Sequence, residues 1–470
     1  GWCLVTQAPI IVWFRRDFRF SDHEALSAAH STGRPIIPVF IFDEVFEVLG
    51  AAPKWRLGLA IECFKKKLER MGSSLILRRG NACEILQELV NETGALDVYW
   101  SRAYDPASIH RDTKVKSLLN GTSFKGHVLF EPWVPKTKSG ENFKVYTPFW
   151  RHVSSQLSVN STLPKISKLH SPHVWPKSDL LSNWGLGEEM NRGRNVVSKY
   201  INVGEEVALN KLENFIASKV NGYKIDRDFP MRHATSGLSE NLTYGEISPR
   251  LIFNSLRNSF DRNDLGAEHF LKELVWREFA YHLLWHFPKL DTQCWRVEWD
   301  NFPWKGINEN AKAWMQGRTG QSFVDAGMRE LYTTGTMHNR LRMIVGSYLT
   351  KHLQTDWRIG LKWFEDCLID WDPASNAMGW QWIAGCGADA APYFRIFNPN
   401  LQAEKFDSDG QYRKKWLEAD KELHAKAFFD AIPVAWKLSA DKIIQNEIVD
   451  LYQGRKSALD AYSAFKEQEN

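Results

Sequence analysis

Residues 370–399 hold the densest group of side chains that could bind a ligand or carry chemistry. Two acids, Asp370 and Asp372, and the amide Asn376 stand just ahead of two indoles, Trp380 and Trp382. Glycines and prolines recur through the segment and no simple helix or strand period runs through it, so we expect irregular chain broken into turns. Such a segment could form a ligand wall, and a tryptophan-rich packed loop is an equally weighted alternative.

A second block, residues 235–239, is suited to an anion. It reads Thr235-Ser236-Gly237-Leu238-Ser239 and runs into a predicted helix. Small hydroxyl residues and a glycine at a helix start present free N–H and O–H donors, which can hold a pyrophosphate. On spacing alone, ordinary helix capping is the more common use of such residues.

Two predicted helices carry polar residues on a single stripe. One stripe holds Glu273, Trp276 and Arg277, and the other holds Asn339, Arg342 and Met343. A solvent-exposed Glu with an Arg four residues later is the simpler interpretation of the first stripe. An amide, a guanidinium and a thioether make a poor core face, so the second stripe favours a pocket wall.

The chain that must position these residues is long enough for two domains. It has 470 residues and a mass of 54.3 kDa, with 43% hydrophobic and 25% charged residues, as in an ordinary globular protein. Its 21 tryptophans supply an unusual amount of stacking surface. A net charge of +4 permits a local basic groove for phosphates and does not by itself establish nucleic-acid binding.

The cysteines and the hydropathy pattern exclude several classes of protein. Six scattered cysteines form no C-x-x-C pair, so we expect no metal site, and they fit a reducing, cytoplasmic environment. No run of eighteen apolar residues occurs, and the N-terminus lacks a basic stretch followed by an apolar one. We therefore expect neither a membrane span nor a signal peptide.

The pattern of apolar runs predicts an α/β domain over residues 8–135. Near-continuous apolar runs alternate with helical patterns, which is typical of a parallel sheet covered on both faces. The runs lie at residues 10–13, 36–42, 74–77, 98–100 and 128–130, with helices over 55–71 and 82–92. No G-x-G-x-x-G follows the first run, so the usual dinucleotide fingerprint is absent.

The rest of the chain reads as a linker and an all-α domain. Residues 136–204 are rich in Pro, Ser and Lys with little periodicity, which indicates a linker over the surface. Residues 205–470 are almost wholly helical in pattern. The amphipathic segments lie near 205–221, 245–259, 266–287, 308–316, 321–332, 336–353, 357–369 and 440–453.

The segment at 370–399 also resembles a known sequence block. It reads Asp-x-Asp-x-x-x-Asn-x-x-Gly-Trp-Gln-Trp and then Asp-Ala-Ala-Pro-Tyr-Phe-Arg-Ile-Phe-Asn-Pro, and it is similar to the flavin-binding block of the DNA photolyase and cryptochrome family. Similar stretches cover nearly the whole chain. The resemblance implies a Rossmann-like parallel-sheet domain, a long linker and a helical domain that binds FAD.

The resemblance also implies which residues bind the cofactor. Asp372 is expected to bond the N–H edge of the flavin ring, and Asn376 is expected to face its N5. The Arg342–Asp370 pair would fix the pocket wall, with Arg277 supporting the flavin side. The family's flavin phosphate-binding segment corresponds to Tyr223, Thr235, Ser236, Gly237, Leu238 and Ser239.

Three tryptophans fall at the family positions that relay an electron from the surface to the flavin. They are Trp304, Trp357 and Trp380. Each indole alone is more often a packing residue, because indoles dominate protein cores. Only the match of all three to the family pattern favours a relay.

The implied substrate is DNA that contains a cyclobutane pyrimidine dimer, turned out of the duplex. One electron from reduced FAD, excited by blue light, would split the dimer. The implied substrate contacts are Glu273 and Asn339 on the pyrimidine edges, Trp276 and Trp382 as stacking partners, and Met343 as filler. Family members that repair (6-4) photoproducts have two histidines where this chain has Asn339 and Met343, so that chemistry is not expected.

The antenna chromophore is less well specified. Residues 50–57, 100–105 and 144–150 are similar to the bacterial class III cyclobutane-dimer photolyases, which commonly carry a methenyltetrahydrofolate antenna. Ala107 and Ser108 stand where class I enzymes have an antenna-binding Asn–Glu pair. A class I folate site is therefore not expected, and the antenna stays open.

Three alternatives share parts of this pattern: a cryptochrome-type blue-light photoreceptor, a flavin oxidoreductase that works in the dark, and a helical nucleic-acid binder without chemistry. Asn376 stands where plant cryptochromes typically have Asp, and the chain stops at Asn470 without a long tail; both observations argue against a cryptochrome. No nicotinamide fingerprint occurs, which argues against a flavin oxidoreductase that works in the dark. We expect a light-driven lyase that repairs pyrimidine dimers as a cytoplasmic monomer.

Overall fold

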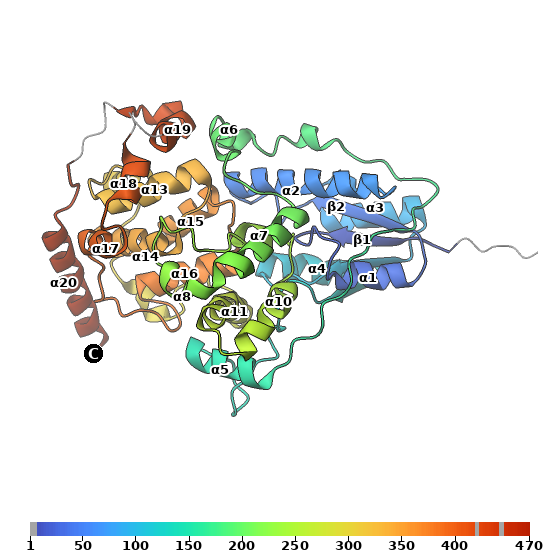
Figure 1. Cartoon of the computed structure of the whole chain (residues 1–470), viewed down its shortest axis with the longest axis horizontal. Coiled ribbons are helices and arrows are strands. Elements are labelled where there is room, and N and C mark those ends of the chain that lie inside the picture. Colours follow the sequence, from blue (N-terminus) through green and yellow to red (C-terminus); the bar gives the residue numbers. More distant parts are fainter. Residues whose placement is uncertain (1–6, 419–422, 441–445) are drawn as a thin grey trace, which may run out of the picture.

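The structure has an α/β domain and a helical domain side by side (Figure 1). It is a computed structural model that describes residues 7–418, 423–440 and 446–470. In Figure 1 the sheet lies at the right and the helical domain at the left, with α20 at its outer edge. The predicted fold class is confirmed.

The sheet contains five parallel strands in the order β3-β2-β1-β4-β5. They are β1 (Ile10–Phe14), β2 (Ile36–Phe42), β3 (Ile76–Arg79), β4 (Asp97–Ser101) and β5 (Gly121–Phe124). The predicted strand at 128–130 was wrong. Residues 128–130 leave the sheet and pack against the helical domain, where their backbone finds other partners.

Helices cover both faces of the sheet, as near-continuous apolar strands require. Alternate residues of β1 divide between the faces. Ile10, Val12 and Phe14 pack with α1 (Glu24–Ser31) and α2 (Ala51–Arg70). Ile11 and Trp13 pack with α3 (Ala82–Thr93) and α4 (Pro106–Leu118). The carboxyl ends of β1 and β4 are left facing the helical domain.

The connecting segment holds more regular structure than predicted. It contains α5 (Tyr146–Gln156), two short 3-10 turns and α6 (Gly193–Val197). Helix α5 is amphipathic, and its apolar residues Tyr146, Phe149 and Val153 are buried against the helical domain. The segment is therefore part of the packed structure as well as a connection.

The helices that follow residue 204 form a large core with the connecting segment. Seven of the eight predicted amphipathic segments, from 205–221 to 357–369, contain a helix, and the described residues hold further helices that were not predicted. The α-helices of this part of the chain are α7 (Glu205–Ser218), α8 (Tyr223–Asp226), α9 (Ser239–Thr243), α10 (Pro249–Asp261), α11 (Leu265–His286), α12 (Glu309–Met315), α13 (Ser322–Thr334), α14 (Asn339–Ser347), α15 (Trp357–Cys367), α16 (Pro373–Ala384), α17 (Pro399–Phe406), α18 (Gln411–Leu417), α19 (Leu423–Ala431) and α20 (Leu451–Glu469). A second cluster of buried residues lies between α7, α10 and the first part of α11.

Two predictions in this domain were wrong. Residues 373–384 form a regular helix, α16, and not irregular chain. Asp372 caps it through the Ser375 N–H at 2.8 Å, Pro373 opens it, and Gly385 ends it with φ +87°. The helix predicted near 440–453 begins only at Leu451, because residues 446–450 form a bend; residues 441–445 lie outside the described residues.

A buried ion-pair group joins the two domains. Arg56 of α2 is fully buried and contacts Glu240 and Glu246 of the helical domain, each at 2.5 Å. The guanidinium also lies 4.6 Å from the centre of the Tyr244 ring. Buried charges are costly unless they are paired, so these contacts fix how α2 docks.

Glu278 of α11 anchors the segment that follows β5. Its Oε1 accepts the backbone N–H groups of Leu129 and Phe130 at 2.6 and 2.9 Å, while Oε2 is buried without a hydrogen-bond partner among the described residues. Burial dominates and raises the pKa of Glu278 from 4.5 to about 7, against the opposing effect of Arg277. The folded protein therefore holds this proton to higher pH than the unfolded chain does.

This raised pKa predicts a pH-dependent stability. The contribution of Glu278 is fully present below the unfolded pKa of 4.5 and is lost as pH rises through about 7. Between about pH 5 and about pH 8, the free energy of unfolding of the native protein should fall by roughly 2–3 kcal/mol relative to a Glu278→Gln variant. Urea unfolding of both proteins across this range measures it, and a pH-independent difference would contradict it.

Candidate functional site

A cavity of about 570 Å³ opens in the helical domain between α11, α14 and α16. This volume is typical of small-molecule sites. Twelve of the residues singled out in the sequence line it, from segments far apart in the chain. They are Ser239, Glu273, Trp276, Arg277, Asn339, Arg342, Met343, Asp370, Asp372, Asn376, Trp380 and Trp382.

The turn before α16 places two carboxylates in the cavity wall. Asp370 Oδ2 accepts hydrogen bonds from Arg342 at 2.8 Å and from the Ser239 hydroxyl at 2.9 Å. Arg342 is itself fixed, because its Nε donates to the Met337 carbonyl at 2.6 Å. Asp372, besides capping α16, accepts a short hydrogen bond from the Tyr281 hydroxyl. Both acids are thus buried and held in place.

Several polar atoms around the cavity lack partners among the described residues. They include Asp370 Oδ1 and the indole N–H groups of Trp371 and Trp380, all buried. Unpartnered buried polar atoms are rare in folded proteins, and a bound polar ligand can satisfy them. A Cβ added at Gly379 would meet open space, so this turn of α16 leaves room beside the wall.

Asn376 lies one turn into α16, on the cavity. Its side-chain Nδ2 donates to the Leu361 carbonyl at 3.2 Å, which leaves the side-chain oxygen as an acceptor. Gly360 allows the neighbouring Trp380 ring to approach α15, because a Cβ there would lie 2.2 Å from the indole. A larger residue at 360 would displace the indole that closes this wall.

The other side of the cavity is formed by α11. Glu273 is partly exposed and forms an ion pair with Arg227, which follows α8. Arg277 also lines the cavity, and its guanidinium donates to the His127 carbonyl at 2.7 Å. Asn339 is exposed at the start of α14, so the cavity has an open, polar mouth.

The predicted phosphate block reaches this cavity only at its end. Ser239 lies in the wall, while Thr235, Ser236, Gly237 and Leu238 are outside the set of lining residues. Ser236 Oγ accepts the Leu238 N–H at 3.2 Å, and Gly237 has φ +71°. Tyr223 packs against Phe215 and Phe270 at ring distances of 5.4 and 5.6 Å. Of the residues predicted to bind the phosphates, the structure thus places Ser239 in the cavity wall and Tyr223 in a neighbouring buried cluster.

The three predicted relay tryptophans differ in burial. Trp380 lines the cavity, Trp357 is fully buried in α15, and Trp304 is partly exposed. A parallel bridge between Lys305 and Thr355 brings the Trp304 segment beside the start of α15. The Trp357 indole N–H donates to the Cys294 sulfur at 3.3 Å.

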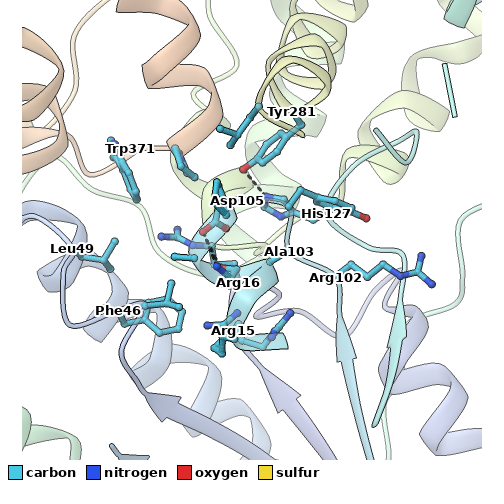
Figure 2. Close-up of a pocket in the computed structure, with 18 of the residues that line it drawn as sticks. Arg15, Arg16, Phe46, Leu49, Arg102, Ala103, Asp105, His127, Tyr281 and Trp371 are labelled. Carbon is cyan, nitrogen blue, oxygen red and sulfur yellow. Dashed lines mark hydrogen bonds between the residues drawn. The ribbon is translucent and has the colours of Figure 1, made fainter. Parts of the chain in front are cut away.

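A second cavity, of about 350 Å³, lies between the domains (Figure 2). Arg15 and Arg16 after β1, and Arg102 and Asp105 after β4, line it together with residues of α11 and the loop before α16. None of the residues that line this cavity was predicted as a site residue. The sequence does indicate a site here, because polar runs directly follow two neighbouring parallel strands, β1 and β4, and ligands commonly bind at such strand ends.

The two cavities share a wall. Trp371 lines both, and Tyr281 contacts Asp372 on one side and lies 3.0 Å from His127 Nε2 on the other (Figure 2). Burial, with Asp372 next, holds the Tyr281 pKa well above 10. Burial and then Arg277 hold the His127 pKa well below 6.5, so both side chains are neutral at physiological pH. A ligand in the second cavity would therefore lie close to the first.

Comparisons with known proteins agree with this architecture. A family described as "FAD binding domain of DNA photolyase" matches residues 270–464, and one described as "DNA photolyase" matches residues 10–168. A deoxyribodipyrimidine photo-lyase of Agrobacterium fabrum is 45% identical over 98% of both chains. Cryptochrome-2 of Arabidopsis thaliana is 33% identical over 87% of this chain and 70% of its own length.

A solved structure is similar throughout. The crystal structure of a bacterial class III photolyase from Agrobacterium tumefaciens superposes with a TM-score of 0.90 and 44% identity, covering 99% of this chain and 100% of that one. The similarity thus includes both domains and the segment between them. The cryptochrome match is lower in identity and in coverage.

Proposed function

The chain belongs to the DNA photolyase and cryptochrome family, and we propose that it is a deoxyribodipyrimidine photo-lyase that splits cyclobutane pyrimidine dimers in DNA under blue light. The observation that carries the proposal is the single cavity that combines two fixed carboxylates and Asn376 on one side with Glu273, Trp276 and Asn339 on the other. The 45% identity to a named photo-lyase over nearly the whole chain supports it.

The cavity fits FAD, because it offers acceptors, an aromatic wall and unpartnered buried polar atoms. Bound FAD in its reduced form would supply, after excitation by light, the electron that splits the dimer. Asp372 would accept from the N–H edge of the flavin ring, and the Asn376 carbonyl would accept at its N5 position. The Arg342–Asp370 pair would keep this wall fixed and nearly neutral, with Arg277 beside it.

The adenosine and phosphate end would extend along the block at 235–239. Thr235, Ser236, Gly237 and Leu238 directly precede the wall residue Ser239 in the chain, and Tyr223 begins the short helix α8 upstream. Gly237 and the hydroxyl residues supply flexible backbone and donors for the phosphates. This part of the proposal rests on the family resemblance and on the contact of Ser239 with Asp370.

The substrate would enter through the open mouth. Turning a damaged pair out of the duplex costs a few kcal/mol, and stacking on Trp276 and Trp382 could return about 1–3 kcal/mol per base. Glu273 and Asn339 would bond the pyrimidine edges, and Met343 would fill the space beside them. Its ion pair with Arg227 already orients Glu273 at the mouth before DNA arrives.

The different burial of Trp380, Trp357 and Trp304, with the bridge between Lys305 and Thr355, supports an electron relay between the cavity and the surface. Trp380 lines the cavity, Trp357 is fully buried and Trp304 is partly exposed. We propose that this path reduces oxidised FAD in light. Repair itself would then depend on Glu273 and Asn376, which face the reacting groups.

The second cavity is our candidate site for an antenna, with methenyltetrahydrofolate as the proposed chromophore. Its arginines could bind a carboxylate tail, and its aromatic residues Phe46 and Trp371 could contact a flat ring. We further propose domain boundaries at 8–135 and 205–470, joined by 136–204.

We also propose that the protein works as a monomer in the cytoplasm. The five described cysteines are all unpaired, which fits a reducing compartment. No helix in the described part of the chain is long and apolar enough to cross a membrane. The described residues also hold no group of three or more His, Cys, Asp or Glu side chains placed for a metal ion.

A repair assay tests the proposed function. We expect purified protein with reduced FAD to restore pyrimidine monomers in a dimer-containing oligonucleotide under blue light and to leave the dimer intact in darkness. A cryptochrome-type photoreceptor, the alternative that the Arabidopsis match keeps in view, would respond to light without restoring monomers. Absence of light-dependent repair with bound reduced FAD would therefore refute the proposal.

Glu273→Ala should weaken binding of dimer-containing DNA about 10- to 100-fold, because a hydrogen bond to a charged group is worth about 1.5–3 kcal/mol. Flavin content should not change. Glu268→Ala is the matched control, since its side chain lies on the same helix, is equally exposed at 34% and pairs with Lys272. Equal repair and binding by the two variants would remove Glu273 from the site.

A further inference from the structure

Tyr146 forms a tightly parallel ring stack with a wall residue of the cavity. It is the first residue of α5, in the segment that connects the two domains. Its ring lies on the Trp276 indole with a centroid distance of 3.7 Å and an interplanar angle of 5°. Trp276 lines the cavity and Tyr146 does not, so the phenol covers the indole face turned away from the cavity.

Tyr146 is itself held from three directions. Its hydroxyl donates to the Lys272 carbonyl at 2.6 Å, and its backbone N–H donates to Asp389 Oδ2 at 3.0 Å. The ring also meets Phe279 edge-on at 5.9 Å, and only 7% of the residue is exposed. The phenol is therefore a fixed surface on which the indole rests.

These contacts join the elements that form the substrate side of the cavity. Lys272 lies one turn before Trp276 on α11, in the same turn as Glu273. Asp389 follows Ala388, which lines the cavity beyond α16. Tyr146 thus fixes the indole relative to both α11 and the loop after α16.

We propose that Tyr146 is a positioning residue for dimer recognition, which holds the Trp276 indole in the plane on which an extruded pyrimidine stacks. This inference rests on the proposed function. An indole that is only half-buried would otherwise have to be ordered when the substrate binds, and that ordering opposes binding. The stack with Tyr146 supplies the order beforehand.

This positioning role gives a reason for the packing of Tyr146, a residue of the connecting segment, against Trp276 in the cavity wall. Undamaged DNA, which contacts the protein through its phosphates, does not need the Trp276 plane. The effect of Tyr146 should therefore appear in the affinity for dimer-containing DNA and not in the affinity for undamaged DNA. A residue with a merely structural role would change both or neither.

Two variants test this role. Tyr146→Leu removes the planar ring, and Tyr146→Phe retains the ring and removes the hydroxyl. In darkness, Tyr146→Leu should weaken binding of a dimer-containing oligonucleotide about three- to tenfold, as expected for loss of one ordered aromatic contact. Its affinity for the undamaged oligonucleotide should be unchanged, and Tyr146→Phe should bind the dimer nearly as well as the native protein.

A second measurement needs no substrate. In protein labelled with 5-fluorotryptophan, the fluorine resonance of Trp276, assigned with Trp276→Phe, should carry a ring-current shift from Tyr146. This shift should be lost in Tyr146→Leu and retained in Tyr146→Phe. Should Tyr146→Leu fail to fold, Tyr146→Met, which keeps apolar volume, gives the same comparison.

The outcomes separate the two hypotheses. An unchanged Trp276 resonance in the Leu or Met variant overturns the positioning role, whatever the protein does. If the Trp276 resonance shifts in the Leu or Met variant but the variant binds dimer-containing DNA with the affinity of the native protein, the role of Tyr146 in recognition is overturned. A native protein that binds dimer-containing and undamaged DNA equally would contradict the proposed function itself, and the resonance would still report whether Tyr146 orders Trp276.

Discussion

The site depends on two buried carboxylates, Asp370 and Asp372, each of which must be bonded by donors from other parts of the chain. Buried acids are costly unless they are paired or hydrogen-bonded, and here the donors come from elements distant in the chain. Arg342 and Ser239 bond the first acid, and the Tyr281 hydroxyl bonds the second. The hydrogen bonds to these two side chains therefore hold α9, α11, α14 and α16 together around an open cavity.

The same contacts connect that cavity with the α/β domain. Tyr281 bonds Asp372 in one cavity and lies beside His127 in the other, while Trp371 lines both. The ends of β1 and β4 complete the second cavity. A ligand bound between the domains would thus be separated from the proposed FAD site by a single layer of side chains, which suits a chromophore that passes excitation energy to the cofactor.

Much of this could be predicted from sequence, and the exceptions have physical causes. Helical spacing fixes which residues share one face of a helix, so the stripes that contain Glu273 and Asn339 could be predicted. Both stripes line the same cavity. Helix α16 was missed because it is apolar on nearly every side, although its caps, Asp372 and Gly385, were readable. The run at 128–130 resembles a strand, but Glu278 takes its N–H groups. The Tyr146 stack depends on long-range docking, which no local pattern encodes.

Binding of FAD to the apoprotein tests the central claim most directly. Gly379 lies on the cavity, and a side chain added there would enter open space. Isothermal titration should give one FAD per helical-domain cavity in the native apoprotein, and Gly379→Phe should abolish this binding while its thermal unfolding midpoint is retained. Binding of FAD by Gly379→Phe with native affinity would place the cofactor elsewhere and contradict the account.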